Sequence, residues 1–138
     1  MGGHYSARSG LAGEVAAAVV VGGPVEAAFS GKGPMRFGMA GIVGNALGLD
    51  APPSPDQFAA VFPGLSLRPL LDQDRNAPML VINGADVVHI PQHDTLVFQG
   101  RRDTVVEFIP DAPHCATTKL PEVFSTIVSW LDRRLSQA

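Results

Sequence analysis

The stretch Val105-Val106-Glu107-Phe108-Ile109-Pro110-Asp111-Ala112-Pro113-His114-Cys115 holds the feature that decides the fold. Its first five residues are mainly β-branched or aromatic and predict a strand, which Pro110 ends. A histidine therefore stands in the loop that follows a strand, and a helical pattern comes after it. Upstream, the apolar run Met79-Leu80-Val81-Ile82 ends in Asn83-Gly84-Ala85-Asp86. An acid and a histidine thus follow two successive predicted strands.

Three apolar runs predict the strands of a parallel sheet. Val15 to Val21 is uninterrupted by any charge and is closed by Gly22-Gly23-Pro24, which is typical of a strand buried on both faces. Met79 to Ile82 and Thr104 to Ile109 are the other two. Helical patterns cover 2–11, 91–99 and 120–135, so the fold class is α/β, with about three parallel strands, flanking helices and right-handed crossovers. The last helix is expected to bury one stripe, formed by Val123, Ile127, Trp130, Leu131 and Leu135.

The middle of the chain differs in composition from these elements. Residues 25–49 are rich in Gly, Met and Phe and only loosely periodic, and we interpret them as two or three short helices over the sheet. The proline cluster at 51–55 predicts a loop that leads into a short helix near Asp56 to Phe62. We interpret 25–75 as a cap-like insertion, or lid, within a single domain that covers 1–138.

Composition excludes several classes of partner. The formal net charge is −3, whereas a nucleic-acid-binding protein normally presents a basic face. The longest apolar run is too short to span a bilayer, so no membrane partner is expected. One Cys cannot form an intramolecular disulfide, and the first residues lack the pattern of a secretory signal. We therefore expect a cytoplasmic protein.

His114 is the best candidate for a catalytic group. Reacting side chains collect beyond the carboxyl ends of parallel strands, and an imidazole can take up and return a proton near neutral pH. Asp86 is the candidate acid that orients this imidazole, as in a Ser-His-Asp triad. Both residue types also occur as structural residues of loops and turns, and that interpretation stays open.

Other side chains are weaker candidates. Asp94, expected on a helix, and Asp111, close to His114, are alternative acids. Cys115 is interpreted as an inert buried thiol, because successive side chains diverge. His89 and His93 have no convincing metal-ligand spacing, since Pro91 separates them. No metal and no other cofactor is predicted.

The chain resembles the α/β-hydrolase superfamily, specifically esterase-like relatives of the fermentation–respiration switch type and polyketide-associated hydrolases. Met1 to Arg8 is similar to the segment that follows the nucleophilic Ser of that group. Leu80 to Pro91 resembles its acid-bearing loop, and Pro110 to Cys115 resembles its His loop. The resemblance covers nearly the whole chain and implies a truncated, C-terminal half of such a hydrolase.

Two departures from the family pattern concern the triad. No Gly-x-Ser-x-Gly elbow is present, and the family's Ser would lie one position before Met1. The family's Asp stands four residues before the loop Pro, where this chain has Val87, so Asp86 is one residue early. Ser6 is the nearest replacement nucleophile, although a helical Ser lacks the strained turn of an elbow.

Two functions follow as expectations. The first is a carboxylesterase-like hydrolase of small ester substrates, with His114 as general base, Asp86 as orienting acid and an uncertain nucleophile. The second is a catalytically inactive remnant of that fold, which acts as an oligomeric binding or scaffold module. With the preceding strands absent, Val15 to Val21 becomes an open edge, so a homodimer or higher oligomer through this strand is expected.

Overall fold

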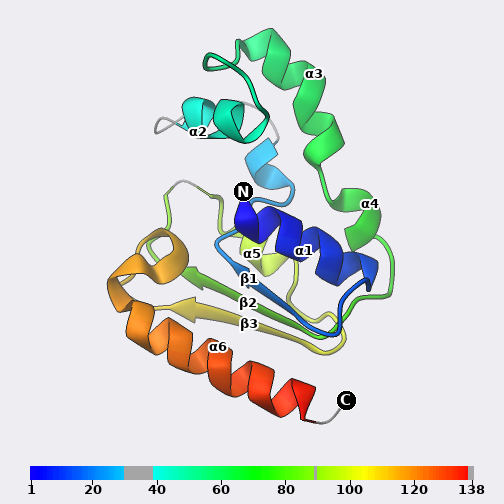
Figure 1. Ribbon diagram of the computed structural model, residues 1–138, viewed down its shortest axis with the longest axis vertical. Helices are drawn as coiled ribbons and strands as arrows, with labels where there is room; N and C mark the ends of the chain where they lie inside the picture. Colours follow the sequence, from blue (N-terminus) through cyan, green and yellow to red (C-terminus); the bar gives the residue numbers. More distant parts are fainter. Residues whose placement is uncertain (30–38, 89, 137–138) are drawn as a thin grey trace.

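The computed structural model describes residues 1–29, 39–88 and 90–136. Its centre is one sheet of three parallel strands in the order β1-β2-β3, with β1 at Ala18–Val21, β2 at Met79–Gly84 and β3 at Thr104–Ile109 (Figure 1). Val19 pairs with Leu80, and Leu80 with Val105. The three parallel strands and flanking helices predicted from the sequence are confirmed.

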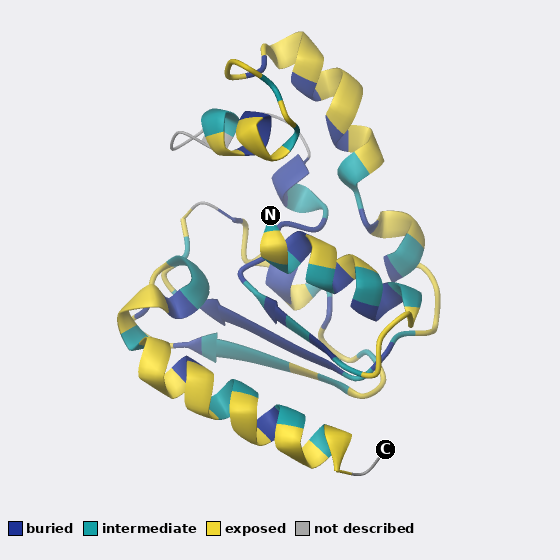
Figure 2. Ribbon diagram, in the orientation of Figure 1, coloured by how far each residue is buried: buried dark blue, intermediate teal, exposed yellow. Residues whose placement is uncertain are grey.

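Helices cover both faces of this sheet. On one face, α1 (Gly2–Ala12) and α5 (His93–Leu96) enclose a core that includes Leu11, Met79 and Phe98. On the other face, α6 (Leu120–Leu135) covers Leu80, Ile82 and Ile109 with Val123 and Trp130. Because it has helices on both sides and a strand on each flank, β2 is buried along its whole length (Figure 2).

The first strand is shorter and less enclosed than its sequence predicts. Pairing with β2 starts at Ala18, and Val15 lies outside the strand, 41% exposed. Burial alternates along β1, because Ala18 and Val20 are buried whereas Val19 and Val21 are only half-buried. The prediction of a strand from Val15 to Val21 that is buried on both faces is therefore wrong. A strand with only one neighbouring strand keeps part of its surface open.

Two further predictions need correction. The helix expected from Pro91 to Gln99 is only the single turn of α5. Leu135 was assigned to the buried stripe of the last helix but is 54% exposed, since it lies beyond the sheet cluster formed by Val123 and Trp130. The bounds of that helix are as predicted.

Short helices fill the segment between β1 and β2. They are η1 (Ala27–Phe29), α2 (Met39–Ala46), α3 (Pro55–Leu65) and α4 (Arg68–Leu71). The predicted helix near Asp56 lies within α3, which begins with a capping box between Ser54 and Gln57. Phe29, Val43, Phe58 and Phe62 form a separate apolar cluster above the sheet. The predicted segment also includes residues 30–38, which lie outside the described part.

No helix in the described ranges combines the length and the apolar character that crossing a membrane requires.

Candidate functional site

His114 lies where the loop after β3 crosses the carboxyl end of β1. The contact is close, because a Cβ placed on Gly22 would lie 2.7 Å from Cε1 of His114 and 2.6 Å from Sγ of Cys115. Gly22 also has a φ of +59°, which glycine adopts without strain. The glycine after β1 therefore leaves room for the predicted catalytic histidine, which is half-buried there.

Asn83, at the end of β2, holds this loop in place. Its side chain is fully buried, and its Oδ1 accepts hydrogen bonds from the backbone N–H of Cys115 (3.1 Å) and of Gly84 (3.0 Å). Its Nδ2 donates to Oγ1 of Thr95 at 3.2 Å. A buried amide whose oxygen and nitrogen are both hydrogen-bonded is rigid. The position of the histidine loop is therefore fixed relative to the centre of the sheet.

The turn after His114 has an uncommon backbone conformation. Cys115 (φ 59°) and Ala116 (φ 50°) both lie in the left-handed region that side chains with a Cβ avoid. Such residues cost on the order of 1–2 kcal/mol each and collect at functional sites. The bond from Cys115 N–H to Asn83 helps to stabilise this turn.

Asp86 is tethered to the histidine loop by its backbone. Its N–H donates to the carbonyl of Ala112 at 3.0 Å. Its side chain is exposed, and within the described residues its carboxylate makes no hydrogen bond with His114. The two loops therefore meet, and the orienting role of Asp86 stays a prediction. Asp111 is likewise exposed.

Ser6 lies on α1 and faces the strand beside it. Its hydroxyl donates to the carbonyl of Val19 at 2.6 Å, which is a short and well-formed hydrogen bond. Before Ser6 could attack a substrate, this bond would have to break. Its proposed role as the nucleophile stays a prediction.

Cys115 is a poor nucleophile in this environment. Burial raises the pKa of its thiol above the ordinary value, although the α-ammonium group of Met1 acts in the opposite direction. The thiol is therefore protonated at neutral pH. The first turn of α1 lies close to this loop, because Gly3 packs against Gly23, the residue after Gly22.

Asp94 has a structural role that sequence reasoning did not predict, and its role as an alternative acid stays a prediction. It is 1% exposed on α5, and its carboxylate accepts four backbone hydrogen bonds, from the N–H groups of Val25 (3.1 Å), Glu26 (3.1 Å), Ala27 (2.6 Å) and Ala28 (2.9 Å). Four aligned N–H groups form an anion-binding concavity. Asp94 thereby fixes the segment that leaves β1 toward the short helices between β1 and β2. No feature of the sequence predicted this contact.

His4 was also missed as a structural residue. It is 2% exposed, and its Nδ1 lies 3.0 Å from the carbonyl of Pro24, so Nδ1 carries the proton and donates it. Burial lowers its pKa from 6.5, and the bond to Pro24 opposes that shift only in part. The imidazole is neutral at physiological pH and packs edge-on against Phe29.

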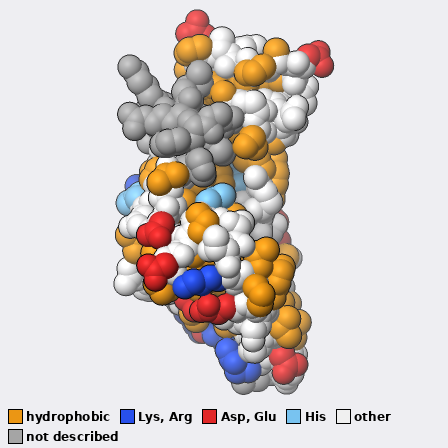
Figure 3. All heavy atoms as spheres, turned by 90° about the vertical axis from the view of Figure 1, so that its left-hand side faces the viewer, with side chains coloured by type: hydrophobic (Ala, Val, Ile, Leu, Met, Phe, Trp, Pro, Cys, Tyr) orange, Lys and Arg blue, Asp and Glu red, His pale blue; other side chains and the backbone are white. Residues whose placement is uncertain are grey.

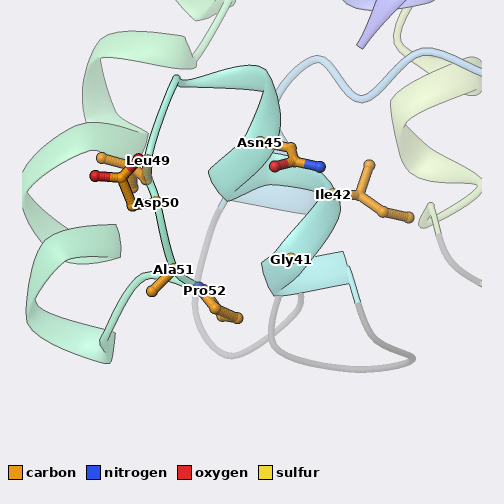
Figure 4. A pocket seen from close by; sticks show the side chains of 7 residues that line it. All are labelled: Gly41, Ile42, Asn45, Leu49, Asp50, Ala51 and Pro52. Atoms are coloured by element: carbon orange, nitrogen blue, oxygen red, sulfur yellow. The ribbon is translucent and has the colours of Figure 1, made fainter.

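Two hollows lie away from His114. One, of about 390 Å³, is formed by α2 and the loop after it, where Ile42 and Asp50 point away from each other rather than toward a common centre (Figure 4). The other, of about 510 Å³, lies between α1 and the α3–α4 junction and is lined by Arg8 and Leu70 among others. In the part of the chain that the structure describes, no three His, Cys, Asp or Glu side chains are grouped so that they could hold a metal ion.

No protein-family model and no curated protein matches this chain.

Proposed function

We propose that this protein is a hydrolase of carboxylic-ester type in which His114 transfers the protons. One observation carries the proposal: the loop with His114 packs on Gly22, at the carboxyl end of a parallel sheet, where reacting groups of α/β enzymes collect. Asn83 supports it further, because a positioned base needs a fixed loop.

Each half of the reaction requires two proton transfers. His114 accepts a proton from the attacking hydroxyl as that oxygen bonds to the ester carbonyl carbon, and it returns this proton to the leaving alcohol as the original acyl C–O bond breaks. A water molecule then attacks the acyl group and gives a proton to His114, which returns it to the hydroxyl oxygen of the protein as the acid is released. The first turn of α1 lies near this loop, because Gly3 packs against Gly23, and the N-terminal end of a helix favours the negative charge that develops on the carbonyl oxygen. Asp86 would stabilise the imidazolium form from the adjoining loop.

Hydrolysis of p-nitrophenyl acetate tests this proposal. We expect the wild-type protein to release nitrophenolate above the rate of the uncatalysed reaction. His114→Ala should reduce that rate by roughly 100-fold or more, because a general base typically contributes that much. His93→Ala is the matched control, since His93 is exposed on α5. A wild-type protein without activity, or equal losses in both variants, would contradict the proposal.

The nucleophile can be identified in a separate experiment. Treatment with a fluorophosphonate, followed by mass spectrometry of the peptides, names the hydroxyl that is labelled. Labelling at Ser6 would mean that its bond to Val19 opens during the reaction. Labelling that is lost in His114→Ala would link the nucleophile to its base.

A second candidate function is a catalytically silent binding or scaffold module that works by self-association. The observation that favours it is the outer edge of β1, which has no neighbouring strand among the described residues. An exposed strand edge is a template for pairing with another chain. Protein that is inert toward the ester but still assembles would support this candidate over the first.

A further inference from the structure

The outer edge of β1 has no neighbouring strand among the described residues. The N–H groups of Ala18 and Gly22 donate to β2, so the alternate residues Val19 and Val21 direct their N–H and C=O groups away from it. The Val19 carbonyl accepts a hydrogen bond from the hydroxyl of Ser6 at 2.6 Å. The Val21 carbonyl lies 3.6 Å from the thiol of Cys115 and close to Gly3 of α1, where a Cβ would lie 2.8 Å from it.

On one face of the sheet, α1 presents small residues beside this edge. The bond from Ser6 to Val19 shows which flank of the helix lies there. At helical spacing the same flank carries Gly2 and Ser9, and Gly13 follows at the C-cap. None of these side chains prevents the close approach of another backbone.

On the other face, α6 exposes an apolar flank. Leu120, Phe124, Val128 and Leu135 are 39%, 58%, 65% and 54% exposed and recur at spacings of about one or two helical turns. With right-handed crossovers and a right-handed helix, this flank of α6 points toward the β1 side of the sheet. Ala17 and Val19 pack against the same cluster as α6, which supports that placement. Figure 3 shows hydrophobic side chains along the right-hand border of the lower half of the molecule.

We infer that these three layers form one interface with a second copy of the chain. A two-fold axis normal to the sheet sets the two β1 strands antiparallel and gives a continuous sheet of six strands, two times three. The same rotation places α1 beside α1 and the apolar flank of α6 beside its own copy. Each layer therefore meets a layer of the same chemistry.

The charges on α6 favour a second copy over a charged partner. Glu122 and Arg133 lie on the flank of the helix opposite Phe124, and Asp132, one turn after Val128, stands at the border of the apolar flank. The surface formed by the β1 edge, the small residues of α1 and the apolar flank of α6 therefore centres on uncharged groups. An uncharged, self-complementary face does not repel its own copy.

The size of this face approaches the lower end of the range for stable dimers. The 16 residues of α6 span about 24 Å, the 11 residues of α1 about 17 Å and the 4 residues of β1 about 13 Å. With each layer about 10 Å deep, the three together offer on the order of 500 Å² per copy, compared with about 600–1,000 Å² per partner in specific interfaces.

This inference rests on the second candidate function, for which it specifies the partner and the geometry. Sedimentation equilibrium at micromolar concentration tests it. We expect the wild-type protein to have a molecular mass twice the 14.5 kDa of the single chain. The double variant Phe124→Asp/Val128→Asp should weaken association by roughly 100-fold, because it places charges in the interface centre. Ser129→Asp adds the same kind of charge to an exposed position on α6 that points away from the apolar flank and should have no effect.

A second variant tests the strand edge itself. Val19→Pro removes an N–H that points away from β2, so the ladder to β2 keeps its bonds while the contact between copies loses a donor. Circular dichroism confirms that each variant is folded. A wild-type monomer, or a dimer that persists in both variants, would overturn the inference. Association through another surface would contradict the proposed geometry but would still be consistent with the scaffold function. Ester hydrolysis is measured separately.

Discussion

Asp94→Ala should be the most destabilising single substitution among those considered. The carboxylate accepts four backbone N–H groups at 2.6 to 3.1 Å, and the bonds from Val25 and Ala28 are buried. A buried N–H that loses its acceptor costs about 1–3 kcal/mol, so the two buried groups alone account for about 2–6 kcal/mol. The other two are partly exposed, and water can replace the lost acceptor there.

This loss is large compared with the stability of a small domain, which is about 5–15 kcal/mol. Urea unfolding, followed by the fluorescence of Trp130, measures it. Trp130 is the single tryptophan and lies on the opposite face of the sheet from Asp94, so it reports unfolding of the whole domain. Asp74→Ala is the control, because Asp74 is exposed and its loss should change stability by less than about 0.5 kcal/mol.

Chemical rescue makes the prediction specific. If the four N–H groups form a preorganised anion site, formate should restore part of the stability of Asp94→Ala, whereas chloride at equal ionic strength should restore less. A loss below about 1 kcal/mol would refute the reasoning, since it would mean that the N–H groups find other acceptors at little cost.

Three further predictions concern the residues around the site. Burial lowers the pKa of His4 from 6.5, so the unfolded chain takes up the proton first as the pH falls. The free energy of unfolding should therefore fall as the pH drops below about 6.5. Urea midpoints measured across this range test the prediction, and His4→Phe should show a smaller change than the wild type. Gly22→Ala should lower the free energy of unfolding by more than the roughly 1–2 kcal/mol of backbone strain alone and should abolish ester hydrolysis, because the new Cβ meets His114. Gly48→Ala is the control that measures the strain alone, since Gly48 has a φ of +72° and no atom within 4 Å of the added Cβ. Parallel thermal melts compare the two variants. Asn83→Ala should cost about 2–4 kcal/mol by chemical unfolding, and an unchanged midpoint would show that its bond to the histidine loop is dispensable.

The elements predicted best are those whose signals are local. The third strand, Thr104–Ile109, and the last helix, Leu120–Leu135, have the bounds expected from the sequence. An apolar run that ends at a proline and a long amphipathic pattern both act within a few residues. The predicted bounds of β1 were wrong because the start of a strand is set by the strand it pairs with. Met79 of β2 pairs with Ala18 rather than with any earlier residue.

The residues of the candidate site also differ in whether their positions could be predicted from nearby sequence. His114 could be placed beyond a strand end from its neighbours in the sequence, and the structure puts it there, against Gly22. Asp94 and His4 could not be placed, because their partners are distant in the chain: 66 to 69 residues separate Asp94 from the N–H groups it binds, and 20 separate His4 from Pro24. A contact across such a distance leaves no periodic pattern to detect.

The amino-acid sequence by itself determined where strands and helices follow one another along the chain and which loop carries His114. Hydrophobic periodicity and proline positions, on which these predictions depend, act over short distances. Only the tertiary structure decided that Asp94 anchors the segment leaving β1 and that Asn83 holds the histidine loop. It also decided that, among the described residues, β1 lies at the edge of the sheet and α6 exposes an apolar flank. These features depend on which surfaces face each other after the chain has folded, and burial of a polar group or an apolar flank is a property of that arrangement.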